Sequence, residues 1–422
     1  MRTRLPTELI LYVLSFLPPD TKLYPILFVG PGFRAEVERR LYTRINLTGN
    51  LIGVEWAPVP GRYVVHEGCM YGRRKLLIKM LSRTPRISIM VQTLTVSPFI
   101  WRSANLYSYG HCETTNEMRS YWLRLNLALQ AMPNLKEFAV GSLTTTTQMN
   151  APIPIKSLFR GCSFHLRRLV ILGIDSQLVE LESGAHSLRR MDIEELVLPS
   201  KYASWSFLEA EVFPKLMALE ITGRWVQCNT AVQLMNPSRI GVKALYLTDM
   251  YLHPGTKCYS YPLLLSLRIC IGWGGYDWSG VGHWVAVTFA SLRFFRLDYP
   301  PYWVSVLCEF INPLLIWAQD RTNELIRLAT ESFRAQRDLV KIVFCAGSVE
   351  PRLFGDKSTW RDRWVPAKGE ATAWNQLDGL QLLANVPQLR TVRFGLQEWG
   401  RDGAVYTVDD NPEEWRDRAW WD

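Results

Sequence analysis

The sequence predicts an α/β chain in which a few short helices precede a long array of parallel strands with helices along the outside of the sheet. A six-residue pattern, apolar–Lys/Arg–x–apolar–x–apolar, recurs along the chain and puts its last two apolar side chains on one face of a strand. Between residues 166 and 292 its copies are 22 to 28 residues apart, a period typical of stacked strand–helix units. Three short helical segments come before residue 47.

The strand pattern has a basic second residue in most of its copies. These copies begin at Leu135, Leu166, Leu188, Val242, Leu292, Val340 and Leu389, and two copies without the basic residue begin at Leu216 and Leu264. Amphipathic segments precede several strands, and we expect them to cover the outer face of the sheet. They are Glu117–Met132, Glu309–Gln336 and Ala373–Asn385.

Residues 48–396 therefore resemble an irregular leucine-rich-repeat solenoid. Regular repeats of that family carry an asparagine three positions after the last strand residue. This chain has other residues there, such as Leu143, Arg224 and Pro300, so the array is expected to be uneven. An ordinary α/β domain built from unrelated strand–helix units remains the alternative.

The first segment of the chain, LPTELILYVLSFLPPD, is apolar on nearly every side. Leu9, Val13, Phe16 and Leu17 follow helical spacing, and three further residues widen this stripe beyond the usual apolar arc. Those three are Leu5, Ile10 and Leu14. The run is too short for a bilayer span, which needs about 20 apolar residues, and no cleavage site of a signal peptide follows it. A helix with two buried sides, one of them against a partner, explains it best.

Two more short helices and a strand are predicted behind this segment. Asp20 can cap a helix at Tyr24–Val29, and Gly30-Pro31-Gly32 is expected to end it. A third helix is expected from about Phe33 to Tyr42, with Glu36 and Arg40 as an i,i+4 ion pair. The alternation in RINL, residues 44–47, predicts the start of a strand.

This order of segments resembles an F-box, particularly the fungal form placed at the N-terminus. The leading Leu-Pro-x-Glu-Leu and the later apolar positions match, and Gly30-Pro31-Gly32 is the departure, because the family keeps polar helix formers there. The resemblance implies that residues 1–47 dock on the Skp-type linker subunit of a Skp–cullin–F-box ubiquitin ligase, and through it on a cullin. The implied docking residues are Leu5, Pro6, Leu9, Ile10, Leu14, Leu17, Val29 and Phe33.

The resemblance implies a non-catalytic adaptor that holds a protein target on the repeat region. Target contact is expected on strand positions between the buried ones, such as Arg168, Tyr246 and Arg296. The alternative is a leucine-rich-repeat interaction scaffold with no ubiquitin-ligase role, whose first helices only cap the array. Residues 397–422 are rich in acids and tryptophan, and they form either a docking peptide or a cap.

Composition narrows the possible partners. The net charge is +9, but the basic residues are scattered, so no nucleic-acid partner is expected. Eight cysteines lie far apart without a C-x-x-C pair, which favours reduced thiols in the cytoplasm or nucleus and disfavours disulfides and zinc.

No motif of an enzyme or of a cofactor site is complete. The glycine-rich stretch after a predicted strand has Asp277 where a dinucleotide fingerprint needs glycine. His111, Cys112 and Glu113, or His253 with Cys258, lack a second ligand pair. The sequence thus predicts no catalytic residues, no cofactor and no metal.

Overall fold

The computed structural model describes part of the chain, and the structural statements below concern that part. The described residues are 9, 12–14, 16, 31–47, 54–56, 63–65, 76–96, 113–141, 154–172, 188–189, 191–199, 211–222, 226–227, 241–251, 260–271, 278–299, 327, 329–346, 379–395, 397–408, 411 and 413–421. The chain forms two compact units. The first comprises residues 1–170 and 178–191, and the second comprises residues 171–177 and 192–422.

The first unit contains a run of parallel strands. β1 (Arg44–Leu47) pairs with β4 (Thr93–Val96), and β4 pairs with β5 (Glu137–Gly141). The backbone N–H of Arg168, the first residue of β6 (Arg168–Leu172), donates to the Lys136 carbonyl at 3.0 Å. A separate antiparallel pair joins β2 (Val54–Trp56) to β3 (Tyr63–Val65). The strand predicted at residues 44–47 is confirmed.

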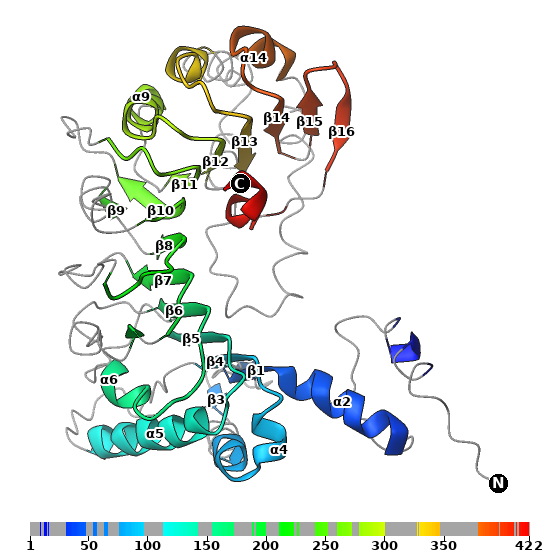
Figure 1. The fold of residues 1–422 in the computed structure, drawn as a ribbon, viewed down its shortest axis with the longest axis vertical. Helices are drawn as coiled ribbons and strands as arrows, with labels where there is room; N and C mark the ends of the chain where they lie inside the picture. The colour runs from blue at the N-terminus through cyan, green and yellow to red at the C-terminus, as the bar shows by residue number, and fades with distance from the viewer. Residues whose placement is uncertain are drawn as a thin grey trace. The chain divides into compact units, whose positions relative to one another are not determined.

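The first unit also contains helices (Figure 1). They are α2 (Pro31–Thr43), a helix at 76–83, α4 (Pro85–Ser88), α5 (Glu113–Gln130) and α6 (Ile155–Leu158). α5 corresponds to the predicted segment at 117–132 and buries Leu125, Ala128 and Leu129 completely. The helix predicted from Phe33 is confirmed but begins two residues earlier. Pro31 and Gly32 lie in the first turn of α2. Proline has no backbone N–H, but the N–H groups of a first turn have no partner within the helix, so Pro31 costs no hydrogen bond there. Pro31 and Gly32 therefore belong to a helix, where the sequence predicted a break between two helices.

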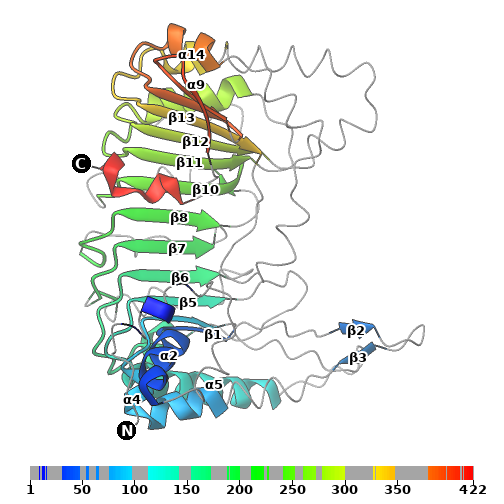
Figure 2. The ribbon, with the colours of Figure 1, turned by 90° about the vertical axis from the view of Figure 1, so that its right-hand side faces the viewer.

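The second unit is an open, mostly parallel sheet whose strands follow chain order (Figure 2). The parallel strands are β7 (Glu195–Pro199), β8 (Ala218–Thr222), β10 (Ala244–Tyr251), β11 (Ser266–Ile271), β12 (Phe294–Tyr299), β13 (Lys341–Ala346) and β14 (Thr391–Phe394). The short β9 (Val226–Gln227) pairs with the end of β10. Two antiparallel strands, β15 (Gln397–Gly400) and β16 (Val405–Thr407), continue the sheet after β14. The helices of this unit are α9 (Trp278–Thr288), a helix at 329–333 and α14 (Gly379–Asn385).

The register of these strands explains the repeated pattern. The fourth residue of each copy lies beside the fourth residue of the next, and the sixth beside the sixth. The first row contains Leu219, Leu245, Leu267, Phe295, Ile342 and Val392, and the second contains Ile221, Leu247, Ile269, Leu297, Phe344 and Phe394. All twelve side chains are buried. The α/β class and the parallel strands are therefore as the sequence predicts.

Two predicted copies of the pattern are wrong in position. At Leu188 the chain makes a helical turn, in which the N–H of Met191 donates to the Leu188 carbonyl at 2.9 Å, and β7 begins only at Glu195. At Val340 the frame is one residue late, because Leu339 is fully buried while Val340 is half-buried. The apolar spacing of LVKIVFC, residues 339–345, fits both frames, and only packing decides between them.

One strand of the first unit escapes the sequence pattern. β4 belongs to the segment VQTLTV at 91–96, which has glutamine where most copies have lysine or arginine. The recurring basic residue lies at the beginning of each strand, with its side chain half-buried or exposed, as at Lys243, Arg293 and Arg390. The basic residue is therefore not needed for strand formation, and a pattern that requires it does not find every strand.

We predict that the two apolar rows carry most of the stability of the second unit. Leu267→Ala removes a fully buried side chain from the middle of a row and should lower the free energy of unfolding by about 2–5 kcal/mol. Leu263→Ala, in the turn before the same strand, removes a side chain that is 45% exposed and should change it by less than about 0.5 kcal/mol. Urea denaturation of both variants measures this, and equal losses would contradict it.

Candidate protein-binding surfaces

The first candidate surface is the N-terminal helical segment at residues 9, 12–14 and 16. Four large apolar side chains are exposed there: Leu9 (49%), Tyr12 (62%), Val13 (49%) and Phe16 (68%). Their spacing of three and four residues puts them on one stripe of a helix, and the Tyr12 and Phe16 rings meet edge to face at 4.6 Å. Leu14 is 1% exposed, so the segment has a buried side and an exposed apolar side.

The segment is fixed to α2 by its backbone. Nη1 of Arg40 donates to the Leu14 carbonyl at 2.8 Å, and Nε of Arg40 lies 2.9 Å from Oε1 of Glu36. The predicted Glu36–Arg40 pair is thus confirmed. Glu36 also accepts from Nε of Arg39 at 2.6 Å, and this hydrogen bond is the main reason that the pKa of Glu36 is lowered. A charged Glu36 keeps Arg40 directed at the N-terminal segment.

The predicted docking residues are only partly within the described chain. Leu9 is exposed, Leu14 is buried, and Phe33 is half-buried in the first turn of α2. Leu5, Pro6, Ile10, Leu17 and Val29 lie outside the described residues. Tyr12, Val13 and Phe16 were not predicted as docking residues, because the motif that guided the prediction does not include them. The helical spacing of Leu9, Val13 and Phe16 is nevertheless visible in the sequence.

The second candidate surface is a face of the sheet in the second unit. Residues 411 and 413–421, which we name the C-terminal segment, contain the short helices η3 (Glu414–Arg416) and η4 (Arg418–Trp420). Figures 1 and 2 show this segment on the side of the strands opposite α9 and α14. The two apolar rows face the helices, and residues at the alternate strand positions face the C-terminal segment.

A row of small side chains makes room for Trp415. Ala218, Ala244 and Ser266 are aligned on three neighbouring strands, β8, β10 and β11. Trp415 packs in the cluster that contains both alanines, is only 1% exposed, and has the Tyr246 ring 5.6 Å away. Oγ of Ser266 donates to the Trp415 carbonyl at 2.6 Å. The hollow formed by the small residues therefore fits one bulky aromatic side chain.

The sheet carries opposite charges on the two sides of this hollow. On β13 and β14, Nζ of Lys341 lies 2.8 Å and Nη1 of Arg393 lies 3.3 Å from the carboxylate of Glu414. These cations are only 10% and 2% exposed, so these ion pairs are little screened by solvent.

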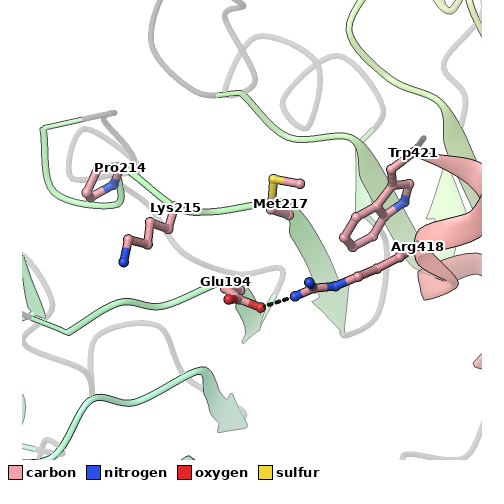
Figure 3. Close-up of a pocket in the computed structure, with 6 residues that line it drawn as sticks. All are labelled: Glu194, Pro214, Lys215, Met217, Arg418 and Trp421. Carbon is pink, nitrogen blue, oxygen red and sulfur yellow. Dashed lines mark hydrogen bonds and ion pairs between the residues drawn. The ribbon is translucent and has the colours of Figure 1, made fainter.

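The acidic side of the hollow binds the arginines of the C-terminal segment. Arg416 pairs with Glu220 of β8 and lies 3.7 Å from Glu195 of β7. Arg418 pairs with Glu194 at 2.6 Å, as Figure 3 shows. The order acid–aromatic–base in Glu414-Trp415-Arg416 thus matches the order of base, hollow and acid across the sheet.

A buried charge cluster supports the basic side. Asp298 of β12 accepts from Nε of Arg268 at 2.5 Å and from Nε of Arg296 at 2.8 Å. Burial lowers the pKa of Arg268, but the neighbouring Asp298 charge raises it, and the net change is upward. Arg268 also lies over the Tyr246 ring at 4.2 Å, and Nη1 of Arg296 donates to the Asn411 carbonyl at 3.1 Å.

The predicted target-contact residues are not free in the second unit. Tyr246 is 8% and Arg296 is 1% exposed, because the C-terminal segment lies over them. Burial also raises the pKa of Tyr246 well above its ordinary value. Target contact at Tyr246 and Arg296 stays a prediction, and in this structure it would require the C-terminal segment to leave them. Arg168, in the first unit, is half-buried.

Two hollows remain beside the C-terminal segment. One has a volume of ≈ 390 Å³ and is lined by Glu194, Pro214, Lys215, Met217, Arg418 and Trp421 (Figure 3). The other, of ≈ 460 Å³, lies among Arg293, Arg337, Arg390 and Trp420, among other residues. The C-terminal segment therefore leaves space unfilled beside it. We name the face of the sheet that this segment covers, with these two hollows, the groove.

Two structural features are missing from the part of the chain that the structure describes. No group of three or more His, Cys, Asp and Glu side chains that could hold a metal occurs among them, and none of their helices is long and apolar enough to cross a membrane. Residues 272–277 of the glycine-rich stretch and His111, Cys112, His253 and Cys258 lie outside the described residues, as does the side chain of Glu113.

Comparison with known proteins gives no assignment. No protein-family model matches the sequence, and no curated protein matches it. The functional interpretation therefore depends on the residues and the surfaces described above.

We predict that Cys162 is unreactive in the folded chain. Burial raises the pKa of its thiol to about 12, so only about one thiol in ten thousand is the reactive thiolate at pH 8. Iodoacetamide at pH 8, followed by peptide mass mapping, should leave Cys162 unmodified until urea unfolds the chain. Rapid labelling under native conditions would contradict the prediction.

We also predict that Asp298 holds two buried arginines in place. Asp298→Asn leaves the Arg268 and Arg296 charges uncompensated and should lower the free energy of unfolding by about 3–5 kcal/mol. Asp192→Asn breaks an exposed ion pair with Lys215 and should cost at most about 1 kcal/mol. Equilibrium unfolding in urea compares the two variants, and similar losses would show that the Asp298 cluster is not important.

Proposed function

We propose that this protein is a non-catalytic adaptor of a Skp–cullin–F-box ubiquitin ligase. Its N-terminal helices would bind the linker subunit, and its strand array would bind a protein target. The observation that carries the proposal is the exposed apolar stripe of Leu9, Tyr12, Val13 and Phe16 on a helical segment whose Leu14 is buried.

The stripe has the chemistry of a helix that lies in an apolar groove of a partner. Such helices contribute anchors at i, i+3, i+4 and i+7, which is the spacing of the four exposed residues. Full burial of a Leu, Val or Phe side chain is favourable by about 1.5–3 kcal/mol. A partner that covers these partly exposed anchors gains part of that free energy at each of them, and the sum is set against the cost of association. The resemblance of the Leu-Pro-x-Glu-Leu start and of the helix order behind it to an F-box supports the linker subunit as the proposed partner.

The role of the strand array would be to hold a target near the ubiquitin-transfer site on other subunits. Proximity alone raises the effective concentration of a target lysine, so the adaptor needs no catalytic residue, metal or cofactor of its own. The spacing of the cysteines favours a reducing compartment, which fits a cytoplasmic or nuclear adaptor.

A second candidate is an interaction scaffold without a ligase role. The N-terminal segment and α2 belong to the same compact unit as β1, β4 and β5. Glu38 of α2 also pairs with Arg86 of α4 at 2.9 Å. These contacts favour helices that cap the array, and the two roles differ in whether the apolar stripe binds a linker.

We predict that the exposed stripe is required for linker binding. The full-length double variant Leu9→Asp, Phe16→Asp changes two exposed side chains, so the fold should persist while co-purification with the Skp-type linker falls at least about tenfold. The matched control, Leu76→Asp with Leu123→Asp, changes side chains that are 65% and 62% exposed elsewhere in the first unit.

The control should bind the linker as the wild type does. Circular dichroism checks that both variants are folded. Linker binding that survives the stripe variant, or a wild-type chain that binds no linker, would favour the scaffold.

A further inference from the structure

The C-terminal segment binds the sheet as a peptide ligand binds a receptor. Among the described residues, its backbone N–H groups donate only within the segment, as in Arg416 to Glu413 and Trp420 to Asp417. No backbone-to-backbone hydrogen bond joins it to a strand in that part of the chain. Its attachment depends on side chains: one aromatic anchor, ion pairs on both sides, and side-chain donors such as Ser266 and Arg296.

The groove recognises a short sequence of side-chain types. Lys341 and Arg393 take an acid, the hollow over Ala218, Ala244 and Ser266 takes an aromatic ring, and Glu220 takes a base. Reversing the order of the three would place like charges together at both ends. Like charges in such contact are destabilising, which gives the groove a preferred direction.

The resident segment fills the groove incompletely. The indole N–H of Trp415 and that of Trp421 are buried without a hydrogen-bond partner among the described residues. The two hollows beside Arg418 and Trp420 also stay open. A different segment that fills these hollows can bind more tightly than the chain's own residues.

We propose that this face is a peptide-binding groove for a target segment with the order acid, bulky aromatic, base, and that the C-terminal segment is its intramolecular occupant. This rests on the proposed function, since it names the class of target that the adaptor holds. The occupant keeps unsuitable proteins from the groove, and a target must displace it.

Displacement sets the affinity that a target needs. Only residues 408–410 lie between the end of β16 and Asn411 in the sequence. A tether this short gives the attached segment an effective concentration in the millimolar range. A free peptide therefore competes poorly with the intact segment. Weakening the segment should expose the groove to peptides of the same chemistry.

The test uses full-length chains and a fluorescein-labelled peptide of residues 411–421, NPEEWRDRAWW, with binding measured by fluorescence anisotropy. The variant Glu414→Lys, Trp415→Ala removes the acid and the aromatic anchor and should bind the peptide at least about tenfold more tightly than the wild type. Trp415→Phe, which keeps an aromatic ring in the hollow, should behave as the wild type does.

A charge exchange tests the direction of binding. Adding Glu220→Arg to the opened variant should abolish binding of the original peptide and restore binding of a peptide with Arg416→Glu. Circular dichroism and the urea midpoint of each variant are measured alongside. Linker co-purification should be unchanged in all of them, so the result is separate from the test of the adaptor role.

Each outcome decides the proposal. Tight binding to the opened variant, with the charge exchange, supports a displaceable occupant. An opened variant that binds no more tightly than the wild type, or that loses its fold, would show that the C-terminal segment is a permanent part of the core.

Discussion

The alignment of apolar side chains in two rows across parallel strands is the constraint on which the rest of the structure depends. In the second unit β8, β10, β11, β12, β13 and β14 each contribute one residue to each row, and all twelve side chains are buried. Because side chains alternate along a strand, a shift of one residue would turn both rows outward. The register is therefore fixed, even though the segments between the strands differ greatly in length. The core tolerates these differences because loop length adds little to the cost of ordering the chain.

Once the rows are fixed, the opposite face of the sheet is free to carry chemistry. Its positions hold alanine and serine over three strands, acids on β7 and β8, and bases on β13 and β14. The two apolar rows already explain the strands without these residues. The charges and sizes on this face instead match the C-terminal segment that covers it. The buried Asp298 cluster follows the same logic. A carboxylate between two arginines is expensive to bury, and here one of those arginines also holds the backbone of the C-terminal segment.

The sequence predicts the strands well because their signal is local. The spacing of apolar residues places seven strands correctly, from the copies that begin at Leu135, Leu166, Leu216, Val242, Leu264, Leu292 and Leu389. It fails at Leu188 and at Val340, where the apolar residues fit more than one frame and only the neighbouring strands decide. The candidate surfaces depend on contacts between distant residues, which no local pattern contains. Nothing in the sequence near Tyr246 or Arg296 indicates that Trp415 and Asn411, more than 100 residues away, cover them. The acid–aromatic–base order of residues 414–416 is visible in the sequence, but its counterpart on the sheet comes from five separate strands, β8, β10, β11, β13 and β14.

The two candidate surfaces differ in whether their large apolar side chains are exposed or covered. The stripe at Leu9, Tyr12, Val13 and Phe16 is exposed, and exposed apolar groups gain from any partner that covers them. Trp415 is covered on its own chain, in a groove of matched charge. The stripe and the groove lie in different compact units, so each surface is built from its own set of residues. An adaptor of this design would join its ligase without a target. Its selectivity would then lie in the competition between a target segment and residues 411–421, because a weakly complementary protein cannot displace an occupant held at millimolar effective concentration.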